Sequence, residues 1–116
     1  MVHQQSGNEI VLVDSWDGFI YAVNAQDGSL NWKTQVAQSK NIGGGLGSSP
    51  VYHTGRKTVF FGQPNGVSEL EIESGAQVGF FETGVQCGSS PALSLDETML
   101  VIACEDGFLY GLHVGI

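Results

Sequence analysis

The two cysteines, Cys87 and Cys104, could do chemistry as a pair, because two thiols either form a disulfide or stay reduced. The turn signal Ser94-Leu95-Asp96-Glu97 predicts a hairpin between them. Folding the chain there places residues whose numbers sum to about 192 opposite each other, and the cysteine numbers sum to 191. We therefore expect the cysteines to be near neighbours. An oxidising compartment would permit a cross-strand disulfide and a reducing one would leave two small apolar thiols; we expect free thiols.

The other groups that could do chemistry lack the spacing that a site needs. The three histidines stand singly, with no second ligand at i+2 or i+4, which argues against a metal site. Acids in predicted turns (Asp14, Asp17, Glu105 and Asp106) could gather Ca²⁺, but turn formation alone explains them. The stretch Gly43–Gly47 invites comparison with a phosphate-binding loop, yet Ser-Ser-Pro and a strand follow it instead of a helix. We expect no catalytic residue, no cofactor-binding residue and no metal site.

A sequence repeat must position these residues. The tripeptide Ser-Ser-Pro occurs at Ser48–Pro50 and again, 41 residues later, at Ser89–Pro91. Within each unit an apolar run leads to a polar-Gly turn, a second run, another such turn and a third run. The first turns are the dipeptides Asp17-Gly18, Asn65-Gly66 and Asp106-Gly107. These dipeptides are typical of type I′ hairpins, whose two central residues need positive φ.

Three partial copies of this unit indicate the fold class. The second turns, Asp27-Gly28 and Ser74-Gly75, lead into third runs. A period near 40 residues with four short strands is typical of a β-propeller blade, a small antiparallel sheet that stacks radially against its neighbours. A β-sandwich also has many short strands, but its strands need not repeat in sequence. We predict an all-β fold of four-stranded propeller blades, in one domain over residues 1–116 with blade units at about 9–36, 47–82 and 88–114.

The number of strands falls short of a closed propeller. We count three strands in the first unit, four in the second and three in the third, because the chain begins at what would be the second strand of a blade. These ten strands make about two and a half blades, whereas closed propellers have about four to eight. We therefore expect a partial propeller that is completed by further blades or by self-association, for example as a homodimer of roughly six blades.

The charge and hydropathy of the chain argue against two classes of partner. Twelve acidic against four basic residues give a formal net charge of −8, which argues against nucleic acid or an anionic membrane surface. No apolar run approaches 18 residues, so we expect no membrane insertion. The first eight residues lack the basic and apolar regions of a signal peptide, and the sequence leaves the compartment open.

Three segments carry a family resemblance. Ala22–Trp32 resembles the pattern Ala-x-Asp-x-x-Thr-Gly-x-x-x-Trp of pyrroloquinoline-quinone-type (PQQ-like) β-propeller repeats. Asp14–Ala22 is similar to the same family's Gly-Ser-x-Asp-Gly-x-Leu-Tyr-Ala, and Glu105–Gly111 matches it again. The resemblance covers nearly all of residues 10–113 and implies that Trp32 packs between blades.

The second unit departs from the family pattern. Gly79 lies four residues after Gly75, where the family has its docking Trp, and Phe80 and Phe81 follow. Glu69-Leu70 stands in place of the Tyr-Ala step. We expect this joint to be weakened, or to be filled by Phe80.

The same resemblance implies two kinds of function. Enzymatic members, the quinoprotein dehydrogenases, hold a quinone and usually Ca²⁺ over the channel of a whole ring, and many carry an adjacent Cys-Cys pair that this chain lacks. Non-enzymatic relatives are scaffolds, sensor domains and appended modules. We therefore predict a non-enzymatic module that acts as a protein-interaction scaffold or sensor. The alternatives are a fragment of a quinoprotein dehydrogenase and an oligomeric propeller that binds a small ligand or carbohydrate.

Propeller topology also predicts where a partner would bind. Turns between the second and third strands, and crossovers between blades, emerge on one face around the channel. The predicted binding face consists of Trp16, Asp17, Asn41, Pro64, Asn65, Gln86, Glu105 and Asp106. An exposed Trp among amides and acids suits a protein segment or a small polar ligand.

Overall fold

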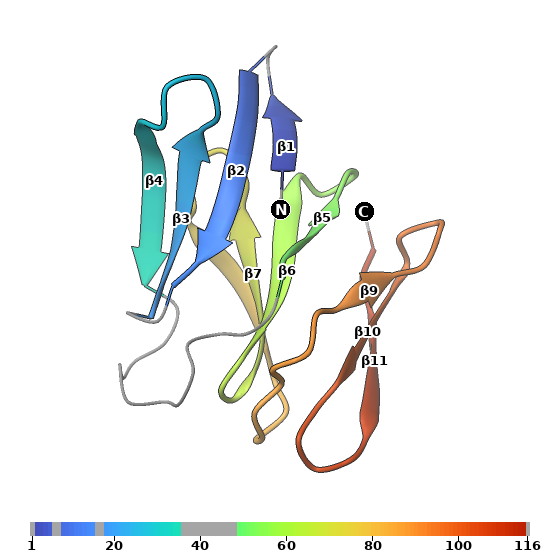
Figure 1. Ribbon diagram of the computed structural model, residues 1–116. Helices are drawn as coiled ribbons and strands as arrows, with labels where there is room; N and C mark the ends of the chain where they lie inside the picture. The colour runs from blue at the N-terminus through green and yellow to red at the C-terminus, as the bar shows by residue number, and fades with distance from the viewer. Residues whose placement is uncertain (1, 6–7, 16–17, 36–48, 116) are drawn as a thin grey trace.

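A computed structural model describes residues 2–5, 8–15, 18–35 and 49–115. These residues form strands and turns, arranged as three antiparallel sheets that follow one another along the chain (Figure 1). No helix within the described ranges is long and apolar enough to cross a membrane. The all-β fold of small antiparallel sheets that the repeat predicted is confirmed.

The order of strands within each sheet follows the order of the chain. The first sheet contains β1 (Val2–Gln5), β2 (Asn8–Asp14), β3 (Phe19–Asn24) and β4 (Leu30–Gln35). The second contains β5 (Val51–His53), β6 (Thr58–Gln63), β7 (Gly66–Glu71) and β8 (Gln77–Glu82). The third contains β9 (Ala92–Leu93), β10 (Met99–Ala103) and β11 (Leu109–His113).

The first sheet has one more strand than the sequence predicted. β1 pairs with β2 from Val2↔Val11 to Gln5↔Asn8, so the described part of the chain contains a complete four-stranded first sheet. The expectation that the chain begins at the second strand of a blade, with ten strands in all, was wrong. The residues of β1, Val-His-Gln-Gln, include a single apolar one, so no apolar run marked this strand.

The two Ser-Ser-Pro tripeptides introduce the inner strands of neighbouring sheets. β5 begins directly after Pro50 and β9 directly after Pro91, as the repeat predicted. The copies also touch, since the backbone N–H of Ser49 donates to the Oγ of Ser90 at 2.9 Å. The repeat therefore aligns the two sheets at their inner edge.

The first turns of the second and third units are not the type I′ turns that their dipeptides predicted, and Asp17 of the first unit lies outside the described residues. Gln63 pairs with Gly66, so Pro64-Asn65 form the tip of one hairpin and Gly66 already belongs to β7. In the third sheet the N–H of Gly107 donates to the Cys104 carbonyl at 3.1 Å, and Gly107 has φ of 84° while Asp106 does not have positive φ. This is a three-residue loop with glycine in the left-handed position, the next most common hairpin connection.

The core consists of two layers, one on each side of the second sheet. All six residues of β6 are buried, because its side chains alternate between the two neighbouring sheets. The layer toward the first sheet contains Ile10, Leu12, Ile20, Ala22, Trp32, Val59, Phe61, Leu70 and Ile72. The layer toward the third sheet contains Phe60, Val67, Cys87, Leu100, Ile102 and Val114. Each layer is a joint between two blades.

Trp32 lies in the joint between the first two sheets, as the family resemblance implied. Its ring is 8% exposed, and its indole Nε1–H donates to the carbonyl of Ile72 at 2.8 Å. A Cβ on Gly75 would lie 2.3 Å from the Trp32 ring, so the glycine leaves the space that the ring occupies. Trp32 therefore packs against the β7–β8 turn of the second sheet.

The joint between the second and third sheets uses an ion pair in place of a tryptophan. The strand registers match Ala22↔Trp32 of the first sheet with Glu69↔Gly79 of the second. The Glu69 carboxylate, 1% exposed, accepts from Arg56 Nε at 2.7 Å, Arg56 Nη2 at 3.0 Å and Thr58 Oγ1 at 2.6 Å. Arg56 Nη1 then donates to the Gly115 carbonyl at 3.2 Å, as Trp32 does to Ile72 in the first joint.

Two expectations for this second unit were therefore wrong. Phe80 does not fill the joint, because its position in β8 leaves the ring 39% exposed. In the second sheet the residues at the positions of Tyr21-Ala22 are Ser68-Glu69, one residue earlier than the expected Glu69-Leu70. The difference arises because the first hairpin turn of the second sheet is shorter than that of the first sheet.

Candidate functional site

Cys87 and Cys104 are joined by a disulfide, so the expectation of free thiols was wrong. Their Cα atoms are 4.1 Å apart because the crossover after β8 runs beside the end of β10. The near-neighbour relation that the hairpin predicted is confirmed. The register differs by one residue from that expectation, since Leu93 pairs with Leu100 and Ala92 with Val101.

Backbone hydrogen bonds connect three loops around this disulfide. We call the loops at residues 63–66, 83–88 and 104–108 the bridged face; they lie at the same end of the second and third sheets (Figure 1). The Asn65 carbonyl accepts from the N–H of Thr83 at 2.9 Å, and the Gln86 carbonyl accepts from the N–H of Glu105 at 2.9 Å. The disulfide and these bonds fix the three loops relative to one another.

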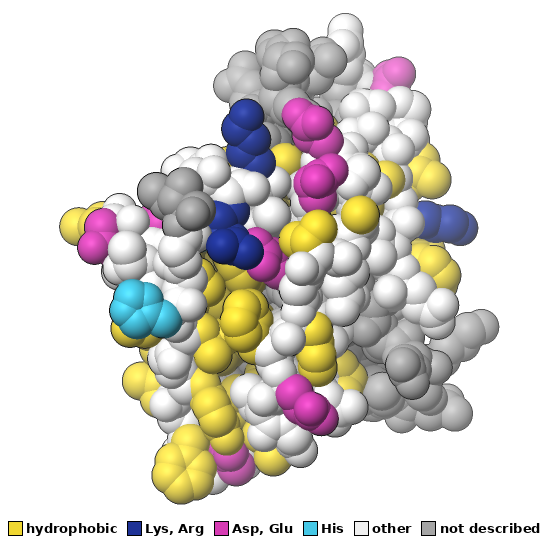
Figure 2. All heavy atoms as spheres, turned by 180° about the vertical axis from the view of Figure 1, so that it is seen from behind, with side chains coloured by type: hydrophobic (Ala, Val, Ile, Leu, Met, Phe, Trp, Pro, Cys, Tyr) yellow, Lys and Arg dark blue, Asp and Glu magenta, His cyan; other side chains and the backbone are white. Residues whose placement is uncertain are grey.

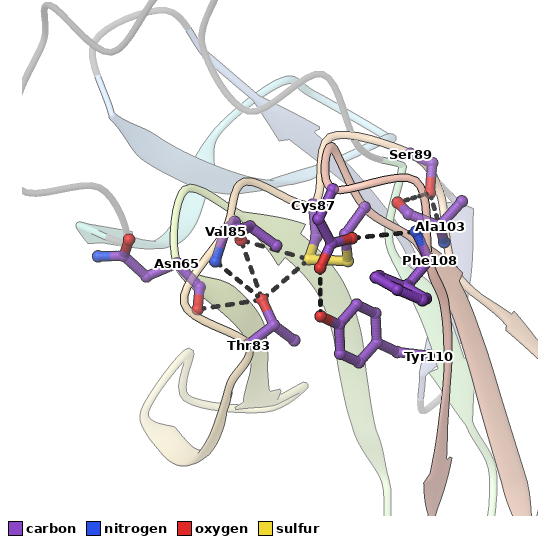
Figure 3. Close-up of a disulfide and its surroundings, with 10 residues drawn as sticks. Asn65, Thr83, Val85, Cys87, Ser89, Ala103, Phe108 and Tyr110 are labelled. Atoms are coloured by element: carbon purple, nitrogen blue, oxygen red, sulfur yellow. Dashed lines mark hydrogen bonds between the residues drawn. A yellow bond between two sulfur atoms is a disulfide. The ribbon is translucent and has the colours of Figure 1, made fainter.

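Thr83 closes the network on the side of the second sheet (Figure 3). Its Oγ1 lies 2.9 Å from the Val85 carbonyl and 3.2 Å from Cys87 Sγ. The same hydroxyl lies 3.3 Å from the Asn65 carbonyl. A single side chain therefore contacts the turn, the crossover and the disulfide.

Asp106 organises the turn on the side of the third sheet. Its Oδ1 accepts from the N–H of Phe108 at 3.0 Å, and its Oδ2 accepts from the Tyr110 hydroxyl at 2.5 Å. The hydrogen bond to Asp106 raises the pKa of the Tyr110 hydroxyl above its ordinary value of 10.0. The carboxylate is thus engaged within its own hairpin, where it binds the backbone of Phe108, and Phe108 itself is 67% exposed.

The predicted binding-face residues fall into two groups. Trp16, Asp17 and Asn41 lie outside the described residues. Pro64, Asn65, Gln86, Glu105 and Asp106 lie on the bridged face, where Asn65, Glu105 and Asp106 are exposed and Pro64 and Gln86 are half-buried. Sequence reasoning missed Thr83, Phe108 and Tyr110, although the repeat of Phe19 and Tyr21 at Phe108 and Tyr110 was a usable signal.

The bridged face offers apolar contact, backbone polar groups and carboxylates. Among the described residues, no group of three or more His, Cys, Asp or Glu side chains is arranged to hold a metal ion. Phe108 and Leu109 are the large exposed apolar residues at this end of the third sheet. From behind, hydrophobic side chains gather over the side of the molecule that the third sheet occupies (Figure 2). Apolar side chains that are exposed together with polar groups are typical of interaction surfaces.

Several solved structures share this arrangement of strands. BamB from Moraxella catarrhalis is 21% identical with a TM-score of 0.69, over 97% of this chain and 32% of that one. Saccharomyces cerevisiae Sqt1 is 17% identical with a TM-score of 0.73, over 92% of this chain and 29% of that one. The quinohemoprotein alcohol dehydrogenase ADHIIG from Pseudomonas putida HK5 is 17% identical with a TM-score of 0.66, over 89% of this chain and 20% of that one.

These likenesses concern the fold. The chain spans about a third or less of the length of each of those structures. No protein-family model and no curated protein sequence matches it. The sheets, their joints and the solved structures together show that the chain has a β-propeller fold, of which its three sheets form successive blades.

Proposed function

We propose that the chain is a non-catalytic propeller module that binds a protein segment at the bridged face. The observation that carries this proposal is the exposed Phe108 ring on a loop frame held by the Cys87–Cys104 disulfide. An aromatic side chain has few rotatable bonds and therefore loses little conformational entropy on binding, and aromatic residues are enriched at the energetic centres of protein interfaces.

The charge of the chain indicates the chemistry of the segment. Glu105 is exposed in the same loop as Phe108, and the whole chain carries a formal net charge of −8. Complementary charge speeds encounter and orients the partner, so a segment with basic residues around an apolar one fits best. The propeller is completed either by further blades or by a second copy of the chain.

The test compares proteins captured by immobilised forms of the chain. The face variants are Phe108→Ser and Glu105→Gln, and the matched controls are Leu95→Ser and Glu73→Gln, at exposed positions outside the bridged face. We expect a protein that binds the unaltered chain and both controls, binds the face variants at least about tenfold more weakly, and is released by salt. Equal capture by face and control variants would overturn the proposal.

A further inference from the structure

The same pair of surfaces meets at both joints of the molecule. We call the side of a sheet that is turned toward the next sheet along the chain its leading face, and the opposite side its trailing face. The leading faces in the two joints carry Leu12, Ile20 and Ala22 in the first sheet and Phe60, Val67 and Glu69 in the second. The trailing faces carry Val59, Phe61 and Leu70 in the second sheet and Leu100, Ile102 and Leu112 in the third.

The third sheet has a leading face that no other described sheet covers. The registers place Val101, Leu109 and Gly111 at the positions of Leu12, Ile20 and Ala22. Ile20 is 0% exposed in the first joint, whereas Leu109 is 70% exposed. The apolar side chain of Leu109 therefore has no packing role within the described part of the chain.

No other described sheet covers the trailing face of the first sheet, and this face has matching character. The registers place Val11, Val13 and Val23 at the positions of Val59, Phe61 and Leu70. Phe61 is 0% exposed in its joint, but Val13 is 48% exposed. Val13 is thus an apolar residue of the kind that a joint buries, but it is exposed like a surface residue.

We propose that the leading face of the third sheet packs on the trailing face of the first sheet of a second copy of this chain. The two open faces carry apolar residues at strand positions that meet in the two joints the chain already makes, so one copy presents what the other receives. The inference rests on the proposed role as a propeller module and names the partner that completes the ring.

Two copies give a ring of suitable size. The described residues of one chain form three sheets, so two copies supply six, within the about four to eight blades of closed propellers. Three copies would supply nine. In a ring of two copies a two-fold axis makes both new joints equivalent, which is the commonest symmetry of oligomers.

The experiment measures molar mass by light scattering during size-exclusion chromatography, over a hundredfold range of concentration. We expect the unaltered chain to reach twice its mass of 12.3 kDa. Leu109→Asp and Val13→Asp should each shift the dimer midpoint at least about a hundredfold upward, because each places a charge in both joints. Leu95→Asp, at an exposed residue in the β9–β10 turn, is the matched control and should leave the midpoint unchanged.

Mixing the two face variants tests the pairing of faces directly. The Val13→Asp chain keeps an intact leading face and the Leu109→Asp chain keeps an intact trailing face, so the mixture should recover a 1:1 complex through one sound joint. This recovery also shows that both variants are folded. A mixture that stays monomeric, a Val13→Asp chain that dimerises normally, or an unaltered chain that remains monomeric throughout would each overturn the proposal.

Salt separates this interface from the proposed partner site. Both copies carry a formal net charge of −8, so added salt screens their repulsion and should strengthen the dimer. Binding of a basic segment at the bridged face should weaken under the same conditions. Phe108→Ser should reduce partner capture without changing the dimer midpoint, so the failure of one proposal is distinguishable from failure of the other.

Discussion

At the scale of single residues, two different solutions hold the two joints together. In the first joint the Trp32 ring fills the space between sheets, whereas in the second the buried Glu69 carboxylate and Arg56 occupy the matching space. Trp32 could be predicted from the sequence because its spacing from Gly28 is a family pattern. The ion pair could not, because an isolated Glu in a strand gives no sign that an Arg from another turn will satisfy it.

Replacing Trp32 should weaken the first joint. Trp32→Ala removes a ring that is 8% exposed, and we expect it to lower the free energy of unfolding by about 3 to 5 kcal/mol. The measurement is chemical denaturation followed by circular dichroism. An unchanged midpoint would show that the ring contributes nothing to the joint.

Replacing Arg56 should weaken the second joint. Arg56→Met leaves the Glu69 carboxylate buried beside a single hydroxyl donor, that of Thr58. Because the arginine is partly exposed, we expect a loss of about 2 kcal/mol, less than for a fully buried pair. Lys57→Met is the matched control, since Lys57 is an exposed cation next in sequence, and it should change the unfolding midpoint little. Equal effects of the two substitutions would contradict this role for Arg56.

At the scale of elements, apolar alternation predicted the central strands of the sheets but did not predict β1, at the edge of the first sheet. β6 and β10 carry clear apolar runs, so their positions followed from the sequence. β1 has one apolar residue, and its place is set by pairing with β2, which alternation does not report. Turn dipeptides gave the location of each hairpin but not its type, because loop length depends on how the two strands pair.

The β3–β4 and β7–β8 turns form a matched pair for testing whether Trp32 needs the space that Gly75 leaves in the β7–β8 turn. Gly28 has φ of 75° and Gly75 has φ of 76°, so alanine costs about 1 to 2 kcal/mol of backbone strain at either. A Cβ at Gly28 has no atom within 4 Å, while one at Gly75 meets the Trp32 ring. We therefore expect Gly75→Ala to lower the free energy of unfolding clearly more than Gly28→Ala. Similar losses in thermal denaturation would show that Trp32 does not need the glycine.

The β9–β10 turn should make the second joint sensitive to acid. Hydrogen bonds from the Thr54 hydroxyl and N–H lower the pKa of Glu97 below its ordinary 4.5, and His53 Nδ1 lies 3.7 Å from the carboxylate. A lowered pKa means that the folded state binds this proton less readily than the unfolded one. The stability from Glu97 is therefore complete above about pH 4.5 and is lost as the pH falls through the lowered value.

Thermal melts between pH 7 and 3 of the unaltered chain and of Glu97→Gln check this dependence. We expect the unaltered chain to be the more stable at neutral pH, with the difference shrinking below about pH 4.5. Glu73→Gln, which neutralises an exposed glutamate in the β7–β8 turn, serves as the control. A difference between the chains that stays constant with pH would contradict the assignment.

At the scale of the whole molecule, the repeat predicted the stacking of blades and therefore which turns share an end. This is why Asn65, Gln86, Glu105 and Asp106 could be grouped from the amino-acid sequence alone. The rigidity of their frame was not predicted, because the sequence placed the two cysteines close together but led us to expect free thiols. The disulfide connects the crossover after one blade to the β10–β11 loop of the next and so belongs to the assembly of blades.

Reducing the disulfide should therefore destabilise the molecule as a whole. The bond closes a loop with a sequence separation of 17, for which the loss of unfolded-state entropy corresponds to about 3 kcal/mol. We expect dithiothreitol to lower the melting temperature of the unaltered chain and to leave that of a Cys87→Ala/Cys104→Ala variant unchanged. Intact mass in the absence of reductant should be two hydrogen masses below that of the reduced chain. If the mass and the melting temperature of the unaltered chain were both the same with and without reductant, the chain would contain free thiols. The bridged face would then lack the bond that fixes its loops.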